Sequence, residues 1–269
     1  MMFSPRNTVR LQKGTRMARI SYGAALESAM ADEMRRDRHV YTMATSPSAA
    51  LLAEFGPMRV KRMPISEATM TGIAVGSAGC GYRPVVHWGS VTFAFMAFDQ
   101  VVNQACKIRY MFGGQRDFPI AFRARYGNGT RSAAQHSQTG YAPYAHLAGL
   151  KVVLPSGAAD ARGLLQSAIR DNNPVVVFEA GRSDPLEEDV DEGDSPVPIG
   201  VASVKRHGSE STSSQKVESR RVRRSMSATS TSASPSTTCG LPTAGCPRLA
   251  FDSSPSLSAR RAGPTRVAG

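Results

Sequence analysis

The organisation of this chain is decided by the stretch Pro64-Ile65-Ser66-Glu67-Ala68-Thr69-Met70-Thr71-Gly72-Ile73-Ala74-Val75-Gly76. An apolar, β-branched segment that predicts a strand over residues 60–65 leads into it, and small residues that predict a helix follow Glu67 directly. These residues leave almost no polar face, so we expect a helix that is enclosed on all sides. A carboxylate at the start of such a helix is costly unless it has a partner. Glu67 is therefore a candidate for proton chemistry; the alternative is a first-turn acid that faces water and interacts with the helix dipole.

The net charge of the chain is +12, but this charge is unevenly distributed. The whole excess of Lys and Arg lies in residues 1–16 and 201–269, whereas acidic and basic residues balance between these segments. A groove that binds phosphates needs its basic residues on the folded part of a protein. We therefore expect no nucleic-acid partner.

The four cysteines, Cys80, Cys106, Cys239 and Cys246, form no CxxC pair and do not resemble a disulfide framework or a zinc site. No run approaches the ~18 apolar residues of a membrane span, and the basic N-terminus lacks the apolar region of a secretory signal. We expect a cytoplasmic protein with no membrane partner. Met17 is an alternative start, because regular patterning begins only after it.

Apolar strands alternate with helices along the middle of the chain. The pattern predicts strands over residues 39–43, 60–65, 83–88, 119–125, 151–154 and 175–179, and helices over 21–36, 47–55, 67–79, 95–111 and 158–170. Nearly continuous apolar strands in this alternation indicate an α/β fold, with a mostly parallel sheet and helices on both faces. Ligands bind at the carboxyl ends of such strands. Glu67 and the polar loop over 126–138, which contains His136, both follow strands and are expected at this edge.

Composition divides the chain into five parts. We expect a disordered basic extension over 1–16, an α/β domain over 17–182, an acidic linker over 183–197, the opening strand of a second domain over 198–206, and a low-complexity tail over 207–269. The tail is rich in Ser and Arg and has no periodicity, so it cannot bury enough apolar surface to fold. A shift of reading frame near Gly208 would explain this composition, and it predicts that a neighbouring frame restores an apolar strand and a helix.

Several motifs occur in order within residues 18–206. They are Pro64-Ile65-Ser66-Glu67, Arg83-Pro84-Val85-Val86, Asp99-Gln100-Val101-Val102-Asn103-Gln104-Ala105, Tyr110-Met111-Phe112-Gly113-Gly114-Gln115, Ala134-Gln135-His136-Ser137-Gln138, Gly149-Leu150-Lys151-Val152-Val153 and Ala168-Ile169-Arg170-Asp171-Asn172-Asn173-Pro174. Together they resemble the β subunit of the thiamine-diphosphate-dependent 2-oxoacid dehydrogenases, the decarboxylating component of the pyruvate, branched-chain and acetoin complexes. The resemblance implies that the 17–182 domain is a transketolase-like pyrimidine-binding domain.

The resemblance implies roles for three side chains. It places at Glu67 the carboxyl group that contacts the aminopyrimidine of thiamine diphosphate, and at Phe93 an aromatic neighbour of that ring. It makes His136 an active-site histidine suited to proton transfer during acyl handover to a lipoyl group. From the residues alone, Phe93 is equally well a core side chain, and His136 a surface one.

The resemblance also implies metal ions and partners. The backbone carbonyls of Ile120, Ala168, Asp171 and Asn173 correspond to a potassium (K+) site in some members, and oxygen donors suit such a hard cation; an ordinary helix C-terminus is the alternative. In this family the Gly-Asp-Gly segment that holds the diphosphate and Mg2+ belongs to the α subunit, and this chain has no such segment. We therefore expect an α2β2 heterotetramer with an α subunit, a lipoyl acyltransferase core as a further partner, and a 2-oxoacid substrate.

Three features depart from the family pattern. The segment Trp88-Gly89-Ser90 carries Gly where a bulkier residue often packs on the cofactor. Thr42-Met43-Ala44-Thr45-Ser46-Pro47 replaces an acidic segment that usually follows the first strand, and residues 207–269 replace a second α/β domain. These differences leave the substrate open between pyruvate, a branched-chain 2-oxoacid and acetoin. They also leave open a catalytically impaired paralogue that acts only as an interaction subunit, and a single-chain thiamine enzyme such as a transketolase.

Overall fold

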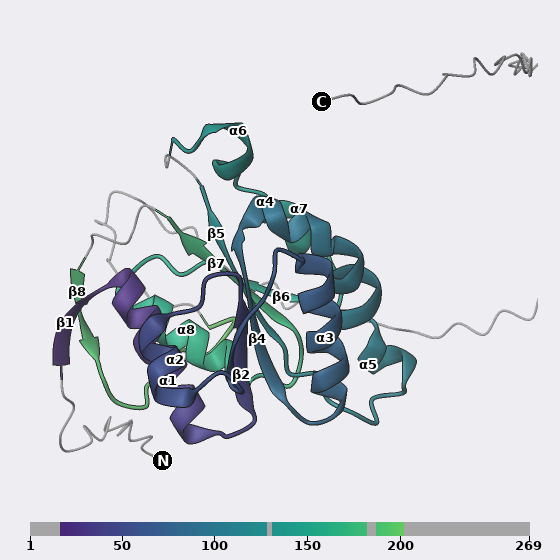
Figure 1. Ribbon diagram of the computed structural model, residues 1–269, viewed down its shortest axis with the longest axis horizontal. Helices are drawn as coiled ribbons and strands as arrows, with labels where there is room; N and C mark the ends of the chain where they lie inside the picture. Colours follow the sequence, from purple (N-terminus) through teal and green to yellow (C-terminus); the bar gives the residue numbers. More distant parts are fainter. Residues whose placement is uncertain (1–16, 128–130, 182–186, 202–269) are drawn as a thin grey trace, which may run out of the picture. The chain divides into compact units, whose positions relative to one another are not determined.

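In the computed structural model, which describes residues 17–127, 131–181 and 187–201, six strands form a parallel sheet (Figure 1). The strands lie in the order β3-β2-β4-β5-β7-β6. Their bounds are Val40–Ala44 (β2), Val60–Arg62 (β3), Arg83–Ser90 (β4), Ala121–Tyr126 (β5), Lys151–Val153 (β6) and Val175–Ala180 (β7). Each neighbouring pair is parallel, which confirms the predicted sheet.

Helices cover both faces of this sheet. The described helices are α1 (Tyr22–Arg36), α2 (Ala49–Phe55), α3 (Glu67–Gly79), α4 (Val91–Ala94), α5 (Ile108–Met111), α6 (Ala133–His136), α7 (Ala142–Ala145) and α8 (Ala158–Arg170). Val85 and Val177 pack with α1, α2 and α8 on one face, whereas Val86 and Phe122 pack with α3 and α4 on the other. Successive strand residues point to opposite faces, so burial on both faces explains the continuous apolar strands. None of these helices is long and apolar enough to cross a membrane.

Two expectations for the stretch around Glu67 are wrong. β3 ends at Arg62, and Ile65 is exposed, because Pro64 has no backbone N–H to continue strand pairing. Helix α3 packs on the sheet along one side only, and its Ile73 is 43% exposed. The helix is therefore open on one side in this chain, although its first residue is buried.

The single helix predicted over residues 95–111 is interrupted. A 3₁₀ turn (η1, Phe95–Ala97) and a π-helical turn (η2, Gln100–Ala105) separate α4 from α5. An i→i+5 turn changes which side chains face the sheet, and Val101 and Ala105 are buried within it. The period of the apolar residues alone did not indicate this insertion.

Part of the predicted acidic linker is a strand. β8 (Glu187–Asp191) pairs antiparallel with β1 (Met17–Ser21), with Met17 opposite Asp191. Val190 is 2% exposed and packs with Ala25 and Ala158, so this ribbon has a small core of its own against α1 and α8. The acidic composition of this segment did not indicate that Val190 would be buried. Residues 198–201 form no strand, and the rest of the expected second-domain strand, the basic extension and the low-complexity tail lie outside the described residues.

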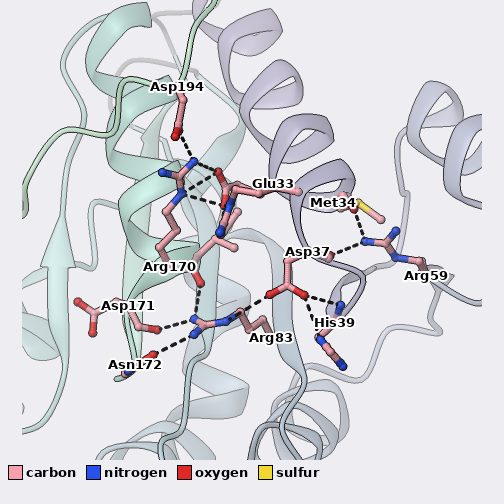
Figure 2. Close-up of polar contacts among 12 residues, drawn as sticks. Glu33, Met34, Asp37, His39, Arg59, Arg83, Arg170, Asp171, Asn172 and Asp194 are labelled. Carbon is pink, nitrogen blue, oxygen red and sulfur yellow. Dashed lines mark hydrogen bonds and ion pairs between the residues drawn. The ribbon is translucent and has the colours of Figure 1, made fainter.

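The buried carboxylate of Glu33 on α1 joins this helix to α8 (Figure 2). The carboxylate of Glu33, whose side chain is 0% exposed, accepts from Arg36 at 2.6 Å and from Arg170 at 2.5 Å. Arg170 also pairs with Asp194, which follows β8. A buried charge is stable only when it is paired and hydrogen-bonded, so these contacts fix the position of α8 on α1.

Candidate active site at the carboxyl edge of the sheet

Glu67 begins α3, and it is 6% exposed. Thr71, one turn further on, donates its hydroxyl to the carbonyl oxygen of Glu67 at 2.8 Å. Trp88 of β4 donates its indole N–H to that hydroxyl oxygen at 3.0 Å, and its ring stacks on Phe122 of β5 at 4.6 Å between ring centroids. A chain of contacts from the middle of the sheet therefore positions the first turn of α3 and the carboxylate that it carries.

A cavity of about 450 Å³ lies beyond the carboxyl ends of the strands. It is lined by residues of β4 and β5 and by segments that follow β2, β5 and β7; they include His87, Ser90, Arg125, Tyr126, Ser132 and His136. This is the edge at which parallel α/β sheets bind ligands. Glu67 is not one of the described residues that line this cavity, so the structure brings His136 to it without Glu67.

Phe93 and His136 come together at this edge. Their ring centroids are 5.1 Å apart, and the rings meet edge to face at 87°. The segment that carries His136 is docked on the end of β5: the N–H of Gly127 donates to the carbonyl of Gln138 at 2.8 Å. A Cβ on Gly127 would lie 2.2 Å from the carbonyl oxygen of His136, so only glycine permits this close approach.

Sequence reasoning missed a polar cluster beside the cavity. His87 of β4 lies opposite Arg123 of β5 in the strand register, and Arg125 of β5 lies opposite Glu179 of β7. Glu179 is 2% exposed; its Oε1 accepts from Nε of Arg123 at 2.5 Å, and its Oε2 lies 3.9 Å from Nε2 of His87. The available signal was the presence of these four ionisable residues in otherwise apolar strands.

The charges within this cluster follow from burial and from Arg123. Burial lowers the pKa of His87 to about 4, and this effect exceeds the opposing attraction of Glu179. Burial alone would raise the pKa of Glu179, but the Arg123 guanidinium, with help from His87 and Arg125, lowers it overall. The cluster is therefore a neutral imidazole beside a carboxylate–guanidinium pair at neutral pH.

The four backbone carbonyls of the expected potassium site lie around the C-terminus of α8 and the start of β5. The carbonyl oxygen of Ile120 accepts from the N–H of Val175 at 2.9 Å. The carbonyl oxygen of Asp171 accepts from Nη1 of Arg83 at 3.2 Å (Figure 2). Arg83 thus places a positive charge beside one of the four carbonyls. Potassium binding through Ile120, Ala168, Asp171 and Asn173 stays a prediction.

The described residues fit one end of thiamine diphosphate. A buried carboxylate on a rigid helix start suits a ring nitrogen of the aminopyrimidine, and the half-buried ring of Phe93 suits an aromatic neighbour. Among the residues that the structure describes, no group of three or more His, Cys, Asp or Glu could hold a metal ion.

Two curated proteins share much of this sequence. The chain is 44% identical over 199 residues to the pyruvate dehydrogenase E1 component subunit beta of Rickettsia felis, an alignment that covers 71% of this chain and 61% of that protein. It is 46% identical over 162 residues to the acetoin:2,6-dichlorophenolindophenol oxidoreductase subunit beta of Bacillus subtilis, covering 60% of this chain and 47% of that protein. The chain thus spans about half to three fifths of the length of these relatives.

The fold and the domain match agree. A solved split-gene transketolase, described as an inactive beta4 tetramer, superposes with a TM-score of 0.50 at 19% identity, covering 69% of this chain and 55% of that chain; this likeness concerns the fold alone. Residues 18–183 match the transketolase pyrimidine-binding domain. Because this match spans more than half of the chain, the protein belongs to the family of the transketolase pyrimidine-binding domain.

Proposed function

We propose that this chain is the β subunit of a thiamine-diphosphate-dependent 2-oxoacid dehydrogenase, in which Glu67 activates the aminopyrimidine of the cofactor. The observation that carries the proposal is the placement of Glu67: a buried carboxylate at a helix start that Thr71 and Trp88 hold to the sheet. The similarity to pyruvate and acetoin dehydrogenase β subunits supports the same assignment.

Each of three side chains has a task in this proposal. Thiamine diphosphate, when bound, supplies a nucleophilic carbon and an electron sink for the oxidative decarboxylation of a 2-oxoacid. Glu67 holds a proton at its carboxyl group against a ring nitrogen of the aminopyrimidine, and its burial keeps water from that proton. Phe93 packs beside the pyrimidine ring. His136, in edge contact with Phe93, holds or moves a proton during acyl transfer to a lipoyl group.

The remaining parts of the reaction are assigned to partners. An α subunit holds the diphosphate and Mg2+ and completes an α2β2 heterotetramer, and a lipoyl acyltransferase core accepts the acyl group. We place the complex in the cytoplasm.

The test is co-expression of the full chain with an α subunit, followed by 2-oxoacid-dependent dye reduction and measurement of thiamine diphosphate affinity. Glu67→Gln keeps the volume of the side chain and removes its shared proton, so we expect activity to fall by at least about 100-fold. Glu54→Gln is the matched control, because Glu54 lies on α2 and pairs with Arg35 at the surface. Activity of Glu67→Gln equal to that of the unmodified complex would refute the role of Glu67.

An acetoin-cleaving dehydrogenase is the second candidate. Its support is the 46% identity to the acetoin oxidoreductase subunit of Bacillus subtilis, which is as high as the identity to pyruvate dehydrogenase subunits although it extends over fewer residues. The same complex, assayed with acetoin in place of pyruvate, distinguishes the two.

A further inference from the structure

The cavity at the carboxyl edge of the sheet is lined by polar residues and by one arginine. Arg125, near the end of β5, supplies the positive charge. Three serines, Ser46, Ser90 and Ser132, also line the cavity. No carboxylate is found among the described residues of this lining. The lining therefore suits an anion, because a guanidinium group binds carboxylates through charge-assisted hydrogen bonds.

The two arginines of β5 differ in what they contact. Residues two apart in a strand point to the same face, so Arg123 and Arg125 share one face of β5. Arg123, whose side chain is 14% exposed, pairs with the buried carboxylate of Glu179 at 2.5 Å. Arg125 is exposed and attracts Glu179 only at longer range, with no hydrogen bond or ion pair to any residue that the structure describes. The domain therefore uses the charge of Arg123 for its own packing and leaves that of Arg125 uncompensated.

A fixed positive charge is poorly suited to the carboxylate that a 2-oxoacid loses. The negative charge of that group moves away as carbon dioxide departs. A guanidinium bound to it would therefore stabilise the substrate more than the transition state, and would slow the reaction. A carboxylate that stays on the substrate keeps its contact in both states, and such uniform binding raises kcat/KM without lowering kcat.

We infer that Arg125 is a specificity-determining residue that binds a second, non-reacting carboxylate, so that the substrate is a dicarboxylic 2-oxoacid. The inference rests on the proposed function and narrows its 2-oxoacid class to one with two negative charges. Ser90 adds a donor to the same cavity: its hydroxyl oxygen accepts from the N–H of Thr92 at 3.3 Å, which leaves its own O–H to donate. The cavity volume of about 450 Å³ accommodates a small ligand of this kind.

The first measurement is the affinity of the full chain for 2-oxoglutarate and for 2-oxopentanoate, by ligand-observed NMR titration at fixed ionic strength. These acids have the same carbon chain and differ only in that a methyl group replaces the second carboxylate. We expect 2-oxoglutarate to bind about tenfold more tightly, which corresponds to about 1.4 kcal/mol. Arg125→Gln should remove this preference, and Arg125→Lys, which keeps the charge, should retain most of it. Arg116→Gln is the control, because Arg116 is an exposed arginine that lines a different cavity.

Equal affinity for the two acids, no binding of 2-oxoglutarate, or a preference that persists in Arg125→Gln would overturn the inference. This measurement needs neither cofactor nor turnover, so its failure leaves the proposed role of Glu67 standing. Conversely, full activity of Glu67→Gln would refute that role without changing the binding preference.

The second measurement is the kinetics of the complex with an α subunit. Arg125→Gln should raise KM for 2-oxoglutarate about tenfold and leave its kcat, and both constants for 2-oxopentanoate, within about twofold. If Arg125 instead pairs with the α subunit, the variant weakens the complex and changes the constants for both acids equally, and the inference is wrong.

Discussion

The buried carboxylate of Glu33 makes a quantitative prediction about the stability of the domain. Glu33→Gln removes its negative charge and keeps its volume. In the folded chain this carboxylate accepts from two guanidinium groups, those of Arg36 at 2.6 Å and Arg170 at 2.5 Å, and its side chain is 0% exposed. The variant therefore leaves two cations facing each other across a neutral amide between α1 and α8.

The expected loss of stability in Glu33→Gln follows from the burial of this ion pair. Breaking a buried ion pair by removing one partner typically costs about 3–5 kcal/mol. The side chains of Arg36 and Arg170 are 44% and 24% exposed, so water solvates part of the released charge, and we expect the lower end of this range. A loss of about 3 kcal/mol corresponds to a fall of roughly 100-fold in the folding equilibrium and to a decrease in Tm of about 6–12 °C for a domain of this size.

Urea and thermal unfolding of the full chain, followed by circular dichroism, measure this loss. Asp194→Asn is the matched control, because Asp194 pairs with the same Arg170 but its side chain is 67% exposed. Exposed pairs contribute about 0–1 kcal/mol, so the control should differ little from the unmodified chain. If Glu33→Gln loses less than about 1 kcal/mol, or no more than Asp194→Asn, the buried network does not stabilise the contact between α1 and α8.

Three further predictions concern the site. The free energy of unfolding should fall by up to about 3 kcal/mol as the pH falls from 6.5 to 4. The reason is that the pKa of His87 is 6.5 in the unfolded chain but about 4 in the folded chain, so the unfolded chain takes up this proton first. In His87→Asn the free energy of unfolding should vary less with pH over this range. Gly127→Ala should move the NMR resonances of His136 away from the ring-current shift of Phe93, because the added Cβ lies 2.2 Å from a backbone oxygen; unchanged resonances would contradict the docking contact. Trp88→Phe removes the donor to Thr71 and should cost about 1 kcal/mol in urea unfolding, and a neutral result would mean that this bond does not hold α3.

The sequence was sufficient to predict those helices whose ends are set by their own residues. Helix α1 was predicted from Ser21 onward, and the Ser21 hydroxyl indeed accepts from the N–H of Ala24 at 3.3 Å as an N-cap. Helix α8 has the bounds predicted for it. The interrupted helix between α4 and α5 was not predictable, because a π-helical turn is stabilised by the packing of Val101 and Ala105 on the sheet rather than by local preference.

Strand β8 is a second element that its own residues did not predict. Four of its five residues are acidic, and its composition indicates a solvated connection. It is a strand because β1 lies beside it and supplies both backbone partners and Arg19, which pairs with Glu187 at 3.4 Å. Pairing between segments so far apart in the chain depends on the rest of the domain having folded.

The amino-acid sequence by itself determined the alternation of strands and helices, the parallel sheet, and the position of Glu67 at a strand-to-helix junction, because each of these follows from periodicity and from residues adjacent in the chain. Only the tertiary structure decided that His87, Arg123 and Glu179 form one cluster beside the cavity of His136. Their meeting requires the strand order β4-β5-β7 and its register, and these are set by the packing of helices on both faces of the sheet rather than by any local pattern.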